Sequence, residues 1–321
     1  MPKSIKSIAY VHTSDIDPTA TKAGGDAWEA LVNKCVRAAQ DALDVPPAGY
    51  TPTQRNSLTD LFTSMEATHR AIRLLVQLGD AKPESVDSLV LARLQLEALY
   101  NVCLLVEDPE HVDWFVREAW KRQYVQYLLY REETKVLPRF ANSWDAEHAR
   151  LLTLARIWNV TEEQRLTLEH RELGTTPPVG FHPQAIHDFP TPGKLIRLVP
   201  EGPKKRMLER LYPEYQELCA YAHGRPIAGF GKTVFDDRSP VRKEMGEVEV
   251  RKMFEQRIKA GTQVYSVLAI AQSTAELMPL YQNNVELART AGEAWNEIHD
   301  AHIVASAVWN IRAKPMFGVV G

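Results

Sequence analysis

Apolar residues recur at helical spacing along most of this chain, and the pattern predicts an all-α fold. Within each stretch they stand three and four positions apart, on one face of a helix. No segment alternates in the manner of paired strands. The fold class is therefore a multi-helix bundle, with predicted helices over residues 26–43, 52–78, 84–106, 109–136, 143–158, 204–223, 247–277 and 284–313 and one more after Thr161.

Local signals mark where some of these helices begin and where the helical pattern stops. Asp108 followed by Pro109 is a typical helix start, and Thr161-Glu-Glu-Gln fits a capping box. Prolines crowd the stretch 174–203, which predicts a long loop of the kind that is usually functional or disordered. Residues 224–246 are loop-like as well.

The same pattern divides the chain into an arm, a body and a tail. Residues 1–25 are predicted to be a flexible N-terminal arm, and residues 314–321 a tail. We expect residues 26–313 to form a single all-α domain, in which residues 247–313 could be a separate sub-layer.

The predicted helix over residues 84–106 is the most informative element. It is apolar on nearly every side, which is typical of a helix enclosed by others. Arg93, Glu97 and Asn101 stand four apart within it and form one line of polar residues, which we call the polar seam. A buried charge is costly unless it is paired or used. The polar seam is therefore either a structural ion pair or the wall of a site.

His223 is a further candidate, because it stands at the predicted end of a helix and directly before Gly224. A helix C-terminus favours the charged form of histidine, so His223 could equally cap its own helix. If the protein is an enzyme, Glu97 or His223 would act as acid and base, and Arg93 would hold an anion. The remaining residues that we expect at the ligand site are Tyr100, Asn101 and Arg225.

The composition is that of an ordinary globular protein, with 45% hydrophobic and 25% charged residues. A net charge of −3 gives no general attraction to nucleic acid or anionic lipid. The three cysteines are scattered, which favours small core residues in a reducing compartment over disulfides. Arg93 and Glu97 make residues 89–106 an unfavourable membrane span. We therefore expect a cytoplasmic protein that does not enter a membrane.

Two motifs resemble a bacterial helical family of unknown function. The first is Arg93-x-x-x-Glu97 on the apolar helix. The second, far downstream, is Tyr215-x-x-Leu-Cys-x-x-x-His223-Gly. The resemblance covers about residues 55–225, and it implies a helical fold without a settled activity.

A remoter similarity is to the HEPN ribonucleases, which cut RNA with an arginine and a histidine four to six residues apart. Arg165 and His170 have this spacing. The family prefers a polar residue directly after the arginine, and Leu166 stands there instead. RNA would then be the partner, and a homodimer that joins two copies of Arg165 and His170 would favour this interpretation.

Three functions therefore stay open. The leading hypothesis is a cytoplasmic protein that binds a small polar ligand at the polar seam. The alternatives are a HEPN-like ribonuclease of a defence or toxin system and a structural or protein-interaction module, with the aromatic helix over residues 110–130 as its contact surface. A seam that opens to solvent favours ligand binding, whereas a sealed seam with an exposed aromatic face favours the interaction module.

We predict that the purified protein carries no stoichiometric zinc or iron and holds no cofactor. The cysteines are dispersed, and Glu66-x-x-His69, which resembles half of a di-iron ligand set, has no matching second pair. Metal analysis by plasma mass spectrometry checks this prediction, and about one ion or more per chain would contradict it.

Overall fold

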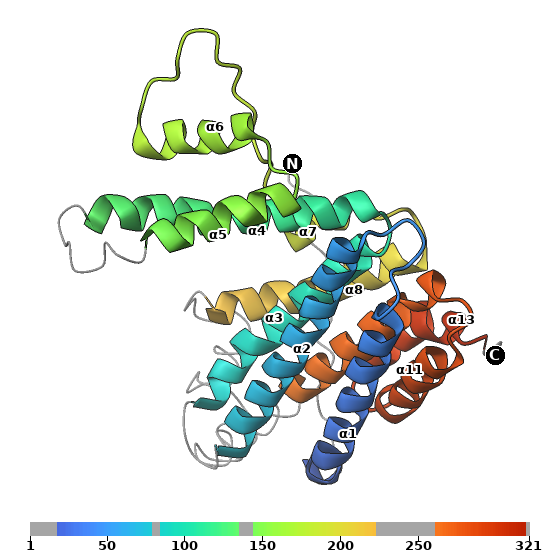
Figure 1. Cartoon of the computed structure of the whole chain (residues 1–321). Coiled ribbons are helices and arrows are strands. Elements are labelled where there is room, and N and C mark those ends of the chain that lie inside the picture. The colour runs from blue at the N-terminus through green and yellow to red at the C-terminus, as the bar shows by residue number, and fades with distance from the viewer. Residues whose placement is uncertain (1–17, 79–83, 135–143, 223–260, 319–321) are drawn as a thin grey trace, which may run out of the picture.

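A computed structural model describes residues 18–78, 84–134, 144–222 and 261–318. Of this described part of the chain, 78% is helical and none is strand. The predicted all-α fold is confirmed (Figure 1). Most predicted helices have the expected bounds to within a few residues, because the apolar stripe of each one packs against a neighbour.

Helix α3 belongs to a bundle of helices from both halves of the chain (Figure 1). It packs most extensively against α2 and α8. Its side chains Leu96, Leu99 and Cys103 are fully buried, as the apolar pattern predicted. The helices of this bundle are α1 (Pro18–Leu43), α2 (Pro52–Leu78), α3 (Glu84–Leu105), α8 (Pro203–Ala222), the helical residues 261–276 and α11 (Val285–Ile298).

A second group of helices lies across one end of the bundle (Figure 1). These helices are α4 (Pro109–Thr134), α5 (Trp144–Ile157) and α6 (Glu162–Leu173). Trp120 of α4 is central to their packing, because its ring stacks on Tyr124 with the centroids 4.7 Å apart. The Trp120 Nε1 donates to the Leu151 carbonyl at 2.8 Å. The capping box predicted at Thr161 is present at the start of α6, which extends away from the bundle.

Among the described residues, α3 is the one helix long and apolar enough to cross a membrane, over Asp87–Leu105. In the structure, 61% of that stretch is buried inside the protein. The core helix of a soluble protein passes the same test of length and composition. The burial of α3 inside the bundle therefore accounts for its apolar sequence.

The loop predicted over residues 174–203 carries more of the core than its prolines suggested. A short helix, α7 (Pro192–Leu195), interrupts it, and Leu195 is fully buried in the main core. Residues before α7 are held by α4, where Lys121 Nζ donates to the Ile186 carbonyl at 3.1 Å. The second half of the loop, from Ile186 on, is therefore packed in place by apolar and polar contacts, whereas residues 174–185 are mostly exposed.

The single helix predicted over residues 284–313 is also wrong. α11 ends early, and the His302 ring accepts a hydrogen bond from the Val304 backbone N–H at 3.2 Å. His302 therefore caps α12 (Ile303–Val308), and burial lowers the pKa of its ring, which favours the neutral form that can accept. The elements that follow are η3 (a π-helical turn, Trp309–Ala313) and α13 (Lys314–Met316).

The two ends of the predicted body differ from expectation. α1 begins at Pro18, inside the residues expected to be a flexible arm, and α13 lies in the predicted tail. The loop expected over residues 224–246 and the start of the helix expected at 247 lie outside the described residues. A single domain over residues 26–313 stays a prediction.

One fully buried carboxylate, Glu276, joins the C-terminal elements to the bundle. Arg312 of η3 donates two hydrogen bonds to it, from Nε and Nη2, each 2.8 Å long. Lys204 Nζ, at the start of α8, lies 3.1 Å from Glu276 Oε2 and also pairs with Glu107, just beyond α3. Gln272 donates a further hydrogen bond at 2.6 Å. Two cations thus offset two carboxylates in what we call the Glu276 network.

The members of this network keep one another charged. Burial by itself raises the pKa of Glu276, but the hydrogen bonds from Arg312 and the charge of Lys204 outweigh burial, and the pKa is lowered overall. Burial likewise lowers the pKa of Lys204, and the charge of Glu276 reverses that effect. Each group is therefore stabilised in its ionised form by the others.

We predict that Glu276→Ala lowers the free energy of unfolding by about 3–5 kcal/mol, because it leaves Arg312 buried without its counter-charge. Folding lowers the pKa of Glu276 below the ordinary value of 4.5. Its stabilising contribution is therefore present above that value and is lost as the pH falls through the folded pKa. Urea unfolding at neutral and acidic pH measures both effects. The difference in the free energy of unfolding between the parent and the variant should become smaller at acidic pH.

The matched control is Glu201→Ala, which also removes one carboxylate paired with a lysine. Glu201 is 85% exposed beside Lys205, so its removal should change the stability little. Equal losses in the free energy of unfolding for the two variants would contradict the prediction, because the buried ion pairs of Glu276 would then matter no more than the exposed pair of Glu201.

Candidate functional site

Arg93 and Glu97 of α3 meet Tyr215 of α8 at the polar seam. Arg93 Nη2 donates to Glu97 Oε2 at 2.9 Å. The Tyr215 hydroxyl lies 3.4 Å from both of these atoms, so it accepts from the arginine and donates to the carboxylate. The guanidinium also lies over the Tyr215 ring, 5.7 Å from its centre. These three side chains form what we call the seam cluster.

The packing of α8 on α3 brings Tyr215 to the seam. Tyr100 lies beneath it, with the ring centroids 5.8 Å apart. Tyr100 is fully buried, and its hydroxyl donates to the Leu208 carbonyl at 2.6 Å. Tyr212 stacks on the Tyr215 ring with the centroids 6.3 Å apart. Tyr100 therefore positions Tyr215, and its own hydroxyl is already used within the fold.

The seam cluster is half-buried and open to water. The side chains of Arg93 and Glu97 are 23% and 33% exposed. Leu94, next to Arg93, is 43% exposed. The expectation that α3 is enclosed on every side is therefore wrong on this face. Because water reaches both charges, the cluster does not need the complete compensation seen around Glu276.

Several polar atoms of the seam cluster are not used by the fold. Arg93 contacts Glu97 and Tyr215 through Nη2, and its buried Nε has no partner among the described residues. Glu97 accepts both hydrogen bonds on Oε2, so Oε1 keeps its acceptor capacity within the described part of the chain. A donor, Arg93 Nε, and an acceptor, Glu97 Oε1, are thus left without a partner among the described residues.

The surroundings favour one protonation state of the cluster. Burial lowers the pKa of Arg93, but the hydrogen bond with Tyr215 and the charge of Glu97 outweigh burial, and the pKa is raised overall. Burial raises the pKa of Tyr215. The guanidinium therefore stays charged and the phenol stays neutral at ordinary pH, so the hydroxyl can accept and donate at the same time.

The other residues predicted for the site are distributed differently. Asn101 lies one turn beyond Glu97, half-buried, and its amide has no partner among the described residues. His223 and Arg225 lie outside the described residues, so their predicted roles stay predictions. In the sequence, Tyr215 was recognised only as part of a family motif. Its spacing of four residues from Cys219 was a signal that both side chains lie on the same face of one helix.

A second, similar cluster, in which Glu162 adds a second carboxylate 3.6 Å from Arg165, lies between α6 and α4. Arg165 pairs with Glu169, four residues later, and the Tyr124 hydroxyl donates to the same carboxylate. The side chains of Arg165 and Glu169 are 20% and 24% exposed, close to the values at the seam. His170, the predicted ribonuclease partner of Arg165, instead has its Nδ1 2.7 Å from the Thr175 hydroxyl. Each member of that predicted pair therefore has its own partners.

The described parts of the chain bring no three His, Cys, Asp or Glu side chains close enough to hold a metal ion. His69 is buried, with its Nδ1 2.8 Å from the Ser266 hydroxyl. Burial lowers the pKa of His69 to about 4, so the ring is neutral at ordinary pH. His69 is therefore a core histidine held by a neighbouring helix.

No protein-family model, no curated protein and no solved structure matches the chain. The all-α fold by itself does not decide the function, because helical bundles carry many unrelated functions. Function must therefore be inferred from the geometry of the site.

We predict that Glu97→Ala lowers the free energy of unfolding by about 1–2 kcal/mol, because it removes a charged hydrogen bond that water partly replaces. Urea unfolding measures the loss. Glu169→Ala is the control, since it removes a carboxylate of similar exposure that pairs with an arginine and a tyrosine. It should cost no more than Glu97→Ala, because Glu162 stays beside Arg165. A loss for Glu97→Ala as large as that for Glu276→Ala would show that water does not reach the seam.

Proposed function

We propose that this is a cytoplasmic helical protein that binds a small polar ligand at the seam cluster. The observation that carries the proposal is the Arg93–Glu97 pair, whose side chains are 23% and 33% exposed and in which Arg93 Nε and Glu97 Oε1 have no hydrogen-bond partner among the described residues. Such a pair matches a ligand that carries both an acidic group and a hydrogen-bond donor.

The contrast with the Glu276 network supports this proposal. A structural ion pair in this protein is fully enclosed and its carboxylate receives hydrogen bonds from several donors. The seam cluster is instead partly exposed to water, and Oε1 of its carboxylate accepts no hydrogen bond from the described residues.

The ligand would meet three kinds of surface. Arg93 would hold its acidic group, Glu97 would accept from its donor, and the ring of Tyr215 would cover its apolar part. If the protein catalyses a reaction, Glu97 is the residue placed to move a proton. The buried, unpaired Cys35 and Cys103 support the proposed reducing, cytoplasmic setting.

Thermal unfolding with a panel of free amino acids and small carboxylic acids, each at millimolar concentration, tests the proposal. At least one compound should raise the melting temperature of the parent, because a ligand that binds only the folded state stabilises it. The Arg93→Met, Glu97→Gln double variant leaves no lone charge and should fold, but its melting temperature should not respond to that compound.

The control is the Arg165→Met, Glu169→Gln double variant, which makes the same change in the second cluster and should keep the response of the parent. The proposal is wrong if no compound stabilises the parent. It is equally wrong if the seam double variant responds as the parent does.

A further inference from the structure

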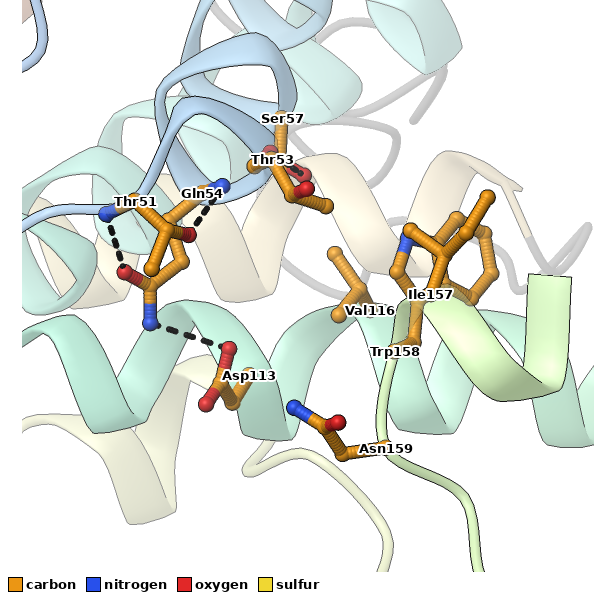
Figure 2. A pocket seen from close by; sticks show the side chains of 9 residues that line it. All are labelled: Thr51, Thr53, Gln54, Ser57, Asp113, Val116, Ile157, Trp158 and Asn159. Atoms are coloured by element: carbon orange, nitrogen blue, oxygen red, sulfur yellow. Dashed lines mark hydrogen bonds between the residues drawn. The ribbon is translucent and has the colours of Figure 1, made fainter.

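A small polar hollow lies at the N-terminal end of α2, where three segments of the chain meet (Figure 2). Its walls come from the first turns of α2, the first turns of α4 and the end of α5 with the two residues after it. Its volume is about 150 Å³, smaller than the cavities that hold drug-sized ligands, so it can take only a compact molecule. It shares no lining residue with the seam cluster.

One wall of the hollow is fixed by hydrogen bonds that leave other polar atoms free. Thr51 and Gln54 form a reciprocal capping box at the start of α2, with distances of 2.8 and 3.2 Å. Gln54 Nε2 also donates to Asp113 Oδ1 at 2.9 Å (Figure 2). Asp113 Oδ2 is 3.7 Å from Arg117 Nη2, which is beyond hydrogen-bond distance. This oxygen is therefore available to accept.

The opposite edge adds a donor and a further hydroxyl. Asn159 adopts a left-handed backbone conformation, with φ of 54°, and its exposed amide has no partner among the described residues. The Thr53 hydroxyl likewise makes no hydrogen bond within the described part of the chain. A non-glycine residue with a positive φ is uncommon, and here it places an amide at the rim of the hollow (Figure 2).

The remaining wall of the hollow is apolar, and the charge of the Asp113 carboxylate is balanced by a neighbouring arginine. Val116, Ile157 and Trp158 line one side of the hollow. The carboxylate of Asp113 is offset by Arg117, which also donates from Nε to the Trp158 carbonyl at 3.1 Å. Neither an anion nor a cation is therefore favoured, whereas a neutral molecule with one polar edge and one apolar face fits both walls.

We propose that this hollow binds a single uncharged sugar ring with vicinal hydroxyls, either as a free monosaccharide or as part of a nucleoside. Ring hydroxyls donate and accept at once, which suits Asp113 Oδ2 and the Asn159 amide together. The C–H face of the ring would rest on the apolar wall, where an indole offers a large apolar surface.

Saturation-transfer NMR with the full chain tests the proposal with D-glucose, D-galactose, D-ribose and adenosine at millimolar concentration. Saturation should pass to at least one of them and not to tetrahydropyran-2-methanol, a ring without vicinal hydroxyls. A response to the sugars identifies a free monosaccharide as the ligand, and a response to adenosine alone identifies a nucleoside.

The Thr53→Val, Asn159→Gly double variant removes two polar groups that the fold does not use. Glycine suits the positive φ at position 159, so the melting temperature should be kept. The dissociation constant for the bound sugar should rise at least tenfold. The control is Thr59→Val with Asn283→Gly, the same changes outside the hollow, which should bind as the parent does.

The proposal is overturned if no sugar or nucleoside receives saturation from the parent, or if the double variant binds as tightly as the parent. Asn159→Gly alone is the second variant, and it should also weaken binding without altering the melt. The Arg93→Met, Glu97→Gln variant should keep sugar binding, which separates this site from the seam cluster.

Discussion

The enclosure of Glu276 is the constraint on which the arrangement of this protein depends. A carboxylate without access to water must be compensated from several directions, and here the compensation comes from Arg312 in η3 and Lys204 at the start of α8. Lys204 in turn reaches Glu107 at the end of α3. Four segments that are distant in sequence must therefore come together for any one of them to be satisfied, which ties the C-terminal elements to the central helices.

Three arrangements of arginine and glutamate in this protein differ chiefly in their access to water. Glu276 is enclosed and receives a bidentate arginine, a lysine and an amide. The arginine and glutamate side chains of the seam cluster and of the Arg165 cluster are 20% to 33% exposed, and each pair shares a tyrosine as a further partner. Desolvation explains this difference, because a charge that keeps some water needs fewer protein partners.

The two proposed sites use polar atoms that the fold leaves over. At the seam, these atoms are Arg93 Nε and Glu97 Oε1. In the hollow, they are the second oxygen of Asp113 and the amide of Asn159. Arg93, Glu97 and Asp113 are already held by hydrogen bonds through their other atoms, so their free atoms are in position before any ligand arrives.

The sequence by itself determined the helices and singled out the polar seam. Apolar periodicity and local caps are short-range properties, so the capping box at Thr161 and the pairing of Arg93 with Glu97 could be predicted from spacing alone. The seam was marked by charges within an apolar run, and Glu276, the lone charge between residues 261 and 280, carried the same signal without being recognised.

Only the tertiary structure decided which charges are enclosed and which residues meet them. Tyr215 reaches Arg93 through the packing of α8 on α3, more than a hundred residues apart in the chain. His302 interrupts a predicted helix because its ring caps α12, and the spacing of apolar residues carries no information about such a cap. Burial depends on what covers a face after folding, so spacing could pair Arg93 with Glu97 but could not show that one side of α3 stays open to water.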